Sequence, residues 1–594
     1  MYLFKRHSKG SAILLVLVFI VIIGWATGIL LSQSFYQRRA NARYAVYHSE
    51  NNAAEYALNK MISEIIFLGT YKPEQVGGGI ENFHNAVLNI QPPMLEGYVF
   101  TDVSITCIQG ENLEYEIIDD PTETWTGFPA LQIIYQLRVR AKGINPPASN
   151  FEHPGVVLER DVQVLNIPLY VFGIFYNNLL EIWPGPQFDM HGRVHSNIDL
   201  WLGANTGANY WEHVTSAGNL FAGRAPGSGK QGESSGPVKI FNGDSLKSMK
   251  LPNGVWLDSA VDNWKNLSEE RWNNYFRDKA HGVRKLNLPI PSYEDPHALI
   301  ERADPENDDP ALKDIKFENK ADLKILRNPV TNEITGYDNM GNIVPLTYED
   351  PDNPEGTKSV YKESMFYNNR ENKFIRCLDL DIANLKESGI DLGNGMAYMS
   401  EEPNGENVQA SCRIINGAHL PATMTGSMTI ASDDPVYVQG DFNVGENRIP
   451  ALVSGDAINI LSNAWNDDAN DFYRHGLQYA SVTETNAIFM GGNVPSGTYD
   501  NTYSGGAENY FRYLENWSGR THAFRGSLLN LWESDIAIGP WIYGKPYYEA
   551  PKRDWRWDSV LGGINPPPGM LSFFQVNPLV WRVVPESEMN LAAE

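Results

Sequence analysis

The longest apolar run of the chain lies close to its first residue. The 21 residues from Ser11 to Leu31 carry no charge, and they follow a short basic segment that ends in Gly10. At about 1.5 Å per residue, a helix of this length crosses the roughly 30 Å hydrocarbon core of a bilayer. The basic flank is expected to stay in the cytoplasm, which leaves the rest of the chain on the far side. The pattern predicts a membrane-inserted helix and an exported body.

Helical spacing of apolar residues continues beyond this run, and no Pro or Gly occurs between Leu31 and Gly69. The residues that carry this spacing are Ala42, Val46, Ala53, Ala54, Ala57, Leu58, Met61, Ile62, Ile65 and Leu68. We therefore expect one unbroken helix over residues 11–68, amphipathic in its second half. A simple membrane anchor does not need that half, whereas a subunit that packs by helix bundling does. A cleaved secretory signal, the third alternative, has an apolar core of only about 7–15 residues.

Past the helix, the pattern changes to an alternation of apolar and polar residues. Residues 69–175 contain the segments VFTDVSITCIQ, LQIIYQLRVRAKG and VVLERDVQVLNI, which predict a small antiparallel β domain. From about Phe188 the apolar segments are shorter and Gly recurs between them, as at Gly426, Gly440 and Gly455. This pattern favours a parallel β-helix, or β-solenoid, over residues 176–254 and 406–540. A β-sandwich is the alternative.

Two further segments complete the expected organisation. Residues 255–405 are polar, with acidic Pro-rich loops, and predict a mixed α/β insertion between the two parts of the solenoid. Residues 541–594 are rich in aromatic residues and Pro, and predict a cap on its last turn. With a basic leader at residues 1–10, the chain is expected to be α+β and mainly β.

Charge and cysteine content narrow the picture further. The 72 Asp and Glu against 47 Lys and Arg give a net charge of −25, which argues against nucleic acid or an anionic membrane surface as the partner of the exported body. The three cysteines, Cys107, Cys377 and Cys412, allow at most one disulfide. Their separation favours Cys377 with Cys412, and three buried free thiols are the alternative.

One acidic loop is a candidate for metal binding. The segment NDDAND offers Asp467, Asp468 and Asp471, which are hard oxygen ligands of the kind calcium prefers. It lacks the Gly and the terminal Glu of an EF-hand loop, so a solvated acidic turn is the alternative. No other cofactor and no catalytic residue is expected.

Aromatic residues gather near the end of the chain. Trp541, Tyr543, Trp555 and Trp557 would form a binding patch for a glycan or another surface ligand if they were exposed together. The alternative is that they bury into the predicted cap.

His191 and His195 form an H-x-x-x-H motif with Gly192 between them and strand-like neighbours. On a strand, residues four apart lie about 13 Å apart at roughly 3.3 Å per residue, too far for one metal ion to bridge. We expect these side chains to be stacked polar residues along the predicted solenoid.

The N-terminal residues resemble a known class of proteins. The basic leader ending in Gly10, the apolar run and its amphipathic continuation resemble the N-terminus of type IV pilins and type II secretion pseudopilins. More narrowly, GSAILLVLVFIVIIGWATG followed by YHSENNAAEYALNK resembles the PilX-like minor pilins. Segments such as MHGRVHSN, FRGSLLNLWES and APKRDWRWDS resemble large bacterial PilX-related surface proteins, a family with a domain of unknown function. The resemblance implies cleavage between Gly10 and Ser11 by a prepilin peptidase, and a sheet packed on the exposed half of the helix.

One position departs from that resemblance. Ordinary pilins have Glu as the fifth mature residue, where this chain has Leu15. Minor subunits at a filament tip share this lack, since a carboxylate without a partner in the membrane is costly. The resemblance therefore implies an initiating or tip position.

These observations predict a structural and interaction protein. It would be a minor-pilin-like subunit of a type IV pilus or a type II secretion-like filament, displaying a large tip or adhesive domain. Its partners would be other pilins, the inner-membrane assembly platform and the prepilin peptidase. The chain would cross the inner membrane once, with its body in the periplasm or at the cell surface. The alternative is an exported, membrane-anchored, polysaccharide-active enzyme on a β-helix, which would need carboxylates within about 5–10 Å of one another in a groove.

Overall fold

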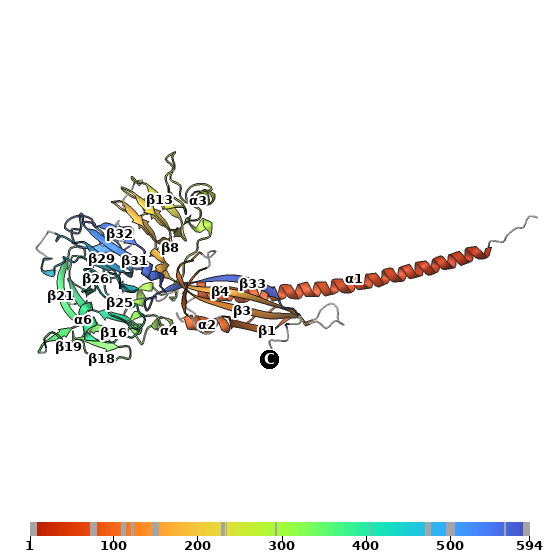
Figure 1. Cartoon of the computed structure of the whole chain (residues 1–594), viewed down its shortest axis with the longest axis horizontal. Helices are drawn as coiled ribbons and strands as arrows, with labels where there is room; N and C mark the ends of the chain where they lie inside the picture. The colour runs from red at the N-terminus through yellow and green to blue at the C-terminus, as the bar shows by residue number, and fades with distance from the viewer. Residues whose placement is uncertain are drawn as a thin grey trace, which may run out of the picture.

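The computed structural model has a long N-terminal helix followed by a body made mostly of β-sheets (Figure 1). It describes residues 9–71, 80–108, 114–119, 124–144, 154–226, 228, 232, 234–290, 294–353, 355–403, 405–469, 477–494, 505–563, 566–585 and 588. Most of the leader expected at residues 1–10 lies outside these residues.

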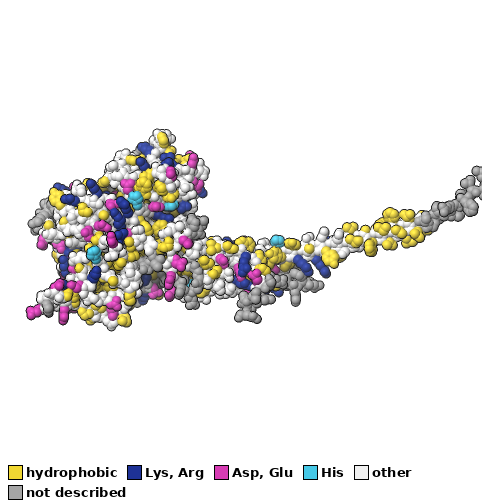
Figure 2. Space-filling model, viewed as in Figure 1, with side chains coloured by type: hydrophobic (Ala, Val, Ile, Leu, Met, Phe, Trp, Pro, Cys, Tyr) yellow, Lys and Arg dark blue, Asp and Glu magenta, His cyan; other side chains and the backbone are white. Residues whose placement is uncertain are grey.

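Helix α1 (Lys9–Ile66) has no break and is followed by a π-helical turn, η1 (Phe67–Tyr71). The unbroken helix expected from the apolar spacing is thus confirmed. Its most apolar stretch has a mean hydropathy of 2.9 and is not buried by the described part of the chain. By length and composition, the helix can cross a membrane. It projects away from the body, with apolar side chains gathered along its free part (Figure 2).

A five-stranded antiparallel sheet covers the second half of α1. Its order is β1-β3-β4-β33, and β2 also pairs with β3. The short helix α2 (Ile80–Leu88) precedes these strands. The strands are β1 (Tyr98–Cys107), β2 (Tyr115–Ile117), β3 (Pro129–Gly143), β4 (Val156–Pro168) and β33 (Ser572–Val583).

The last strand of this sheet comes from the end of the chain. β33 pairs antiparallel with β4, so that Val576 faces Val164. The cap expected over residues 541–594 is therefore wrong for this segment, because β33 joins the N-terminal sheet (Figure 1). Pro578 is tolerated there because β33 is an edge strand, where a missing N–H breaks no ladder on its free side.

The second half of α1 is fixed to the sheet by packing and by polar contacts. The apolar face of the helix and the sheet form one hydrophobic core, to which β3 contributes Ile133. The Glu50 carboxylate accepts the backbone N–H of Gly143 at 2.8 Å, and Arg160 donates to Asn59 Oδ1 at 3.1 Å. The buried apolar residues of the helix are Val46, Ala53, Ala54, Ala57, Leu58, Met61, Ile62 and Ile65.

After β4 and the 3-10 turn η3 (Leu169–Val171), the chain builds a first strand stack. Each turn supplies three short strands, and each strand pairs parallel with the equivalent strand of the next turn. Leu200 thus faces Leu220, 20 residues further on. The strands are β5 (Phe172–Tyr176), β6 (Leu180–Ile182), β7 (Phe188–Met190), β8 (Arg193–Ser196), β9 (Leu200–Leu202), β10 (Ala208–Tyr210), β11 (Val214–Ser216), β12 (Leu220–Ala222) and β13 (Val238–Phe241).

The segment that follows first adds strands to the first stack and then leads toward the second. β14 pairs antiparallel with β13, β15 pairs parallel with β11, and β19 and β20 form a hairpin. The elements are β14 (Leu246–Ser248), α3 (Trp264–Trp272), β15 (Phe276–Arg277), η4 (Lys279–His281), η5 (Pro296–Leu299), α4 (Pro310–Lys313), α5 (Phe317–Lys320), β16 (Leu323–Arg327), β17 (Ile334–Asp338), β18 (Ile343–Val344), β19 (Thr347–Glu349), β20 (Thr357–Ser359) and β21 (Tyr361–Asn368).

A second strand stack completes the body, and its chain alternates between two sheets. One sheet has the order β21-β22-β24-β26-β28-β30. The other runs β31-β29-β27-β25-β23-β16, and β31 also pairs parallel with β5, so this sheet continues into the first stack. The remaining elements are β22 (Lys373–Asp381), α6 (Ile382–Ser388), β23 (Met396–Ser400), β24 (Val408–Ile415), β25 (Met428–Ser432), β26 (Val436–Gln439), β27 (Ala451–Gly455), β28 (Ile458–Leu461), η6 (Asp467–Ala469), β29 (Thr483–Asn493), η7 (Gly506–Asn509), β30 (Phe511–Tyr513), β31 (Thr521–Glu533), β32 (Lys552–Arg556) and η8 (Ser559–Gly562).

Pairing within both stacks is mainly parallel. A β-sandwich, the alternative expected from the sequence, is built from antiparallel sheets and does not fit this pairing. The end expected for the polar insertion at residue 405 is also wrong, because β22 and β23 already belong to the second stack. The charged residues of β22 suggested a solvent-exposed segment. One of them, Asp379, is instead buried and accepts from Arg413 Nη2 at 2.7 Å, so its charge is paired inside the fold.

The favoured cysteine pairing does not form. Cys377 on β22 faces Ser411, and Cys412 on β24 faces Leu378. The two cysteines occupy successive register positions, so their side chains point to opposite faces of the sheet. Both are buried free thiols, as in the alternative, whereas Cys107 is half-buried.

Candidate functional site

The most exposed apolar surface of the molecule is the first half of α1. Its large apolar side chains are between 48% and 78% exposed, with Val18 the lowest and Trp25 the highest. An exposed apolar surface this extensive marks a membrane or protein contact. The residues are Ile13, Leu14, Leu15, Val16, Leu17, Val18, Phe19, Ile20, Val21, Ile22, Ile23, Trp25, Ile29, Leu30 and Leu31.

The predicted processing position lies at the start of this helix. Gly10 and Ser11 are within the first residues of α1, and cleavage between them stays a prediction. Leu15 is 60% exposed on the helix surface, so a partner can reach it. A Glu at this position would present its carboxylate to the same apolar surroundings.

The four aromatic residues of the predicted patch do not form one surface. Trp555 is buried, and its ring packs edge-on against that of Phe511, with centroids 5.5 Å apart. Trp541 Nε1 donates to Tyr548 Oη at 2.6 Å. In the described structure, Tyr543 is 55% exposed.

Trp557 lies at the junction with the N-terminal β domain. Its Nε1 donates to the backbone oxygen of Tyr170 at 2.6 Å, and its ring lies edge-on to Phe128. The prediction of a single patch is therefore wrong, because three of its four members are held by contacts inside the fold.

The predicted calcium loop has one of its carboxylates already engaged. Asp467 accepts from Arg413 Nη1 at 2.7 Å and from Nη2 at 2.9 Å, and Trp465 Nε1 donates to it as well. Burial would raise the pKa of Asp467, but the hydrogen bonds from Arg413 hold it below its usual value. Asp468 is exposed, and Asp471 lies outside the described residues. Within the described chain, no group of three or more His, Cys, Asp or Glu side chains could hold a metal ion.

Two carboxyl groups with raised pKa values are held by bonds inside the body. Burial raises the pKa of Glu508 and of Glu515 to about 7. Glu508 accepts the backbone N–H of Trp183 at 2.9 Å, and Glu515 accepts from both the N–H and the hydroxyl of Ser462. The first bond joins the second strand stack to the first, and the second joins two neighbouring turns of the second stack. The enzyme alternative stays an untested prediction.

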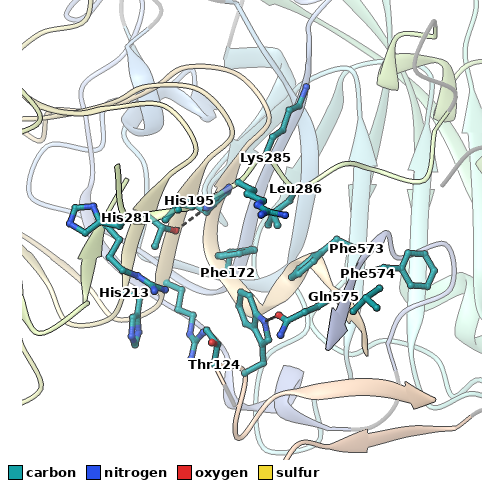
Figure 3. A pocket seen from close by; sticks show the side chains of 18 of the residues that line it. Thr124, Phe172, His195, His213, His281, Lys285, Leu286, Phe573, Phe574 and Gln575 are labelled. Carbon is teal, nitrogen blue, oxygen red and sulfur yellow. Dashed lines mark hydrogen bonds between the residues drawn. The ribbon is translucent and has the colours of Figure 1, made fainter. Parts of the chain in front are cut away.

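A pocket of about 340 Å³ lies where β33 and the end of α1 meet the first strand stack (Figure 3). Its lining includes the aromatic residues Trp125, Phe172 and Phe573. No carboxylate side chain is among the described residues that line it, although the chain as a whole carries a net charge of −25. The basic residues of the lining are Arg193, His195, His213, Arg277, His281, Arg284 and Lys285.

Arg193 lies between two aromatic rings at this pocket. Its guanidinium carbon is 4.9 Å from the ring centroid of Trp125 and 4.7 Å from that of Phe128. Burial lowers the pKa of Arg193 to about 10, and nearby Glu212 opposes this shift. The side chain therefore stays charged at pH 7.

His195 has a structural role in the pocket wall. Its Nδ1 is 2.8 Å from Thr215 Oγ1 on the next strand, and its Nε2 is 3.1 Å from Asn197 Oδ1. Burial lowers the pKa of His195 to about 4, so the ring is neutral at pH 7. It ties β8 to β11, while His191 stacks on Trp211, with ring centroids 5.6 Å apart.

The pocket was missed at the level of sequence because its residues come from five separate segments of the chain. The strongest available signal is the run HGVRKLN over residues 281–287, which is basic in an acidic chain. The aromatic residues of β33 gave no such signal, because their return to the N-terminal sheet depends on tertiary pairing.

Comparisons with known proteins add little. No family model matches the chain, and no curated protein matches it. Among solved structures, the chain is similar to the competence-associated pilin ComZ from Thermus thermophilus. The identity is 11%, over 91% of this chain and 98% of that chain, with a TM-score of 0.21. A TM-score this low does not establish a shared fold.

Proposed function

We propose that the chain is a pilin-like subunit of a type IV pilus or a type II secretion-like filament, which displays its β-rich body outside the inner membrane. The observation that carries this proposal is the division of α1 into two halves. The first half is bare and apolar, and the second is fixed to an antiparallel sheet.

The energetics of α1 require a cover for its first half. Moving one large apolar side chain out of water contributes roughly 1.5–3 kcal/mol, so the whole surface amounts to tens of kcal/mol. That exceeds the net stability of about 5–15 kcal/mol of a typical domain. A bilayer supplies the cover before assembly, and the helices of neighbouring subunits supply it in a filament.

The firm attachment of the second half favours a subunit over a simple anchor. An anchor can hang from a flexible linker, whereas α1 continues into the core of the β domain without a break. The buried Glu50 carboxylate, which accepts the Gly143 N–H, fixes the helix further. The helix and body are thus held as one piece, which suits display from a filament.

For the displayed body we infer an interrupted parallel β-helix. Support comes from the two strand stacks, in which successive turns of the chain pair in parallel along one continuous sheet. Processing between Gly10 and Ser11 and a tip position linked to Leu15 belong to the same proposal. At the filament tip the body would be the part that meets other surfaces first, so the proposal includes an adhesive role for it.

The experiment is mass spectrometry of the membrane-extracted protein, made in cells that contain a prepilin peptidase. The expected N-terminus is Ser11, and a Gly10→Val variant should keep its leader. Gly24→Ala is a matched control within the helix, since nothing lies within 4 Å of a Cβ at that position. An intact Met1 terminus in the unchanged chain would contradict processing and leave an anchored surface protein.

A further inference from the structure

We propose that the pocket between the N-terminal β domain and the first strand stack binds a small anionic ligand that also carries an apolar ring. Its walls come from the end of α1 at Ile66, from β33 and from β8, β11 and β15. An occupant would therefore touch both parts of the molecule. Its volume of about 340 Å³ lies within the range of about 300–1,000 Å³ that is typical of small-molecule sites.

The charge of the lining favours an anion. Arg193 and Arg277 lie within the walls, and the exposed Arg284 and Lys285 add positive charge around them. The acidic side chain that faces this group is Glu212, which lies 3.8 Å from His213 Nδ1 and is half exposed. Among the described residues, the four cationic side chains thus outnumber the acidic ones near them, so a negative charge in the pocket would be stabilised.

The second acidic group near the pocket is already engaged. Asp278 accepts from the hydroxyl of Ser259 at 2.5 Å and from Trp264 Nε1 at 2.8 Å, and it lies 2.8 Å from His281 Nδ1. These contacts hold the pKa of Asp278 below its usual value, although burial would raise it. Its carboxylate therefore does not neutralise the arginine side chains of the pocket.

The two arginine side chains in the walls differ in what an occupant can reach. The Nε atoms of Arg193 and Arg277 are buried, out of reach of an occupant, and have no hydrogen-bond partner among the described residues. The terminal N–H groups of the same guanidinium groups are not among the buried unpaired atoms. A carboxylate, sulfonate or phosphate oxygen in the pocket would bond these terminal N–H groups with a charge-assisted bond, which is stronger than a bond to a neutral acceptor.

The rest of the lining favours an apolar portion in the ligand. Figure 3 shows Phe172 and Phe573 close together inside the pocket. The Trp125 ring lies edge-on to both, with its centroid 5.6 Å from that of Phe172 and 5.4 Å from that of Phe573, and its Nε1 donates to Gln575 Oε1 at 2.7 Å. Aromatic walls next to arginine donors match a flat ligand with a charged group at one end.

The test uses the full chain in detergent and isothermal titration calorimetry. The probe is 2-naphthoate, with neutral 2-naphthamide and inorganic phosphate as comparison ligands. We expect naphthoate to bind the unchanged protein, and both comparison ligands to bind at least tenfold more weakly. The variant Arg277→Gln should weaken naphthoate binding at least tenfold. Arg277 forms no ion pair with another described residue, so the fold should tolerate this change.

Arg520→Gln is the matched control, because Arg520 is exposed and lies outside the pocket lining. It should bind naphthoate as the unchanged chain does. Because both are measured in the same detergent, the heat of naphthoate entering micelles is the same for each. The variant Arg277→Lys keeps the charge and should retain most of the binding. Equal naphthoate affinity in Arg277→Gln and the unchanged chain, at equal thermal midpoints, would overturn the proposal. Equal binding of naphthamide would overturn the anionic part, and equal binding of phosphate the apolar part.

Discussion

At the scale of single residues, the body is held by buried charges in specific pairs. His297 is an example, since its Nε2 lies 3.3 Å from Asp456 Oδ1 and its Nδ1 lies 3.2 Å from Glu301 Oε1. Asp456 in turn accepts the backbone N–H groups of Asp535 and Ala537 at 2.6 and 2.8 Å. The imidazole therefore links η5 to the turns after β27 and β31.

This arrangement predicts a pH-dependent stability. Burial would lower the pKa of His297, but its bonds to Asp456 and Glu301 raise it to about 10. The unfolded value is about 6.5, so the stabilisation is complete below pH 6.5 and is lost as the pH rises toward 10. The thermal midpoint should fall over that range, and His297→Gln should flatten the fall. A His297→Gln profile parallel to that of the unchanged chain would contradict the assignment.

Residue-level predictions from the sequence failed where tertiary pairing decides. The pairing of Cys377 with Cys412 looked natural from their separation, but the register of β22 and β24 sets them on opposite faces. The calcium prediction for Asp467 stays a prediction, but the pairing of this carboxylate with Arg413 was missed, because Arg413 is 54 residues away in the chain. No local pattern shows such a pair.

At the scale of elements, α1 was the part best predicted by sequence. Its apolar spacing and its lack of Pro and Gly after the apolar run depend on local chemistry, and the helix formed as expected. β33 was missed, because its Pro-rich surroundings suggested a cap and its partner β4 lies about 400 residues away in the chain.

The attachment of α1 to its sheet should depend on Glu50. Removing this carboxylate with Glu50→Ala leaves the half-buried N–H of Gly143 without its acceptor, at a cost of about 1 kcal/mol. Hydrogen exchange at the end of β3 should become faster, while the exposed Glu55→Ala serves as the matched control. Unchanged exchange in Glu50→Ala would show that packing alone holds the helix.

β33 should contribute strongly to the stability of the β domain. Phe573 is 4% exposed and its ring packs edge-on against Trp125, with centroids 5.4 Å apart. The change Phe573→Ala should cost about 3–5 kcal/mol. Leu579 on the same strand is 40% exposed, so Leu579→Ala should cost much less. Calorimetric unfolding distinguishes the two, and equal losses would mean that the strand docks loosely.

At the scale of the whole molecule, the sequence predicted a helix and a β-rich body but not how the parts meet. The β domain receives β33 from the chain end, and the second strand stack pairs back onto β5 of the first. These two strand pairings bring the β domain and the two stacks together and so create the basic pocket. Both pairings join segments that lie hundreds of residues apart in the chain. Local periodicity carries no information about them.

The central claim is that the bare half of α1 packs against other pilin-like subunits. The most direct measurement is photo-crosslinking in cells from a benzoyl-phenylalanine placed at Val21, which is 65% exposed on that half. The control places the same group at Ile343 on β18, which is 73% exposed on the body. We predict a discrete adduct of Val21 with the apolar N-terminal helix of a pilin-like partner, and no such adduct from Ile343. Crosslinks from Val21 to lipid alone, in cells that assemble the filament, would contradict the account.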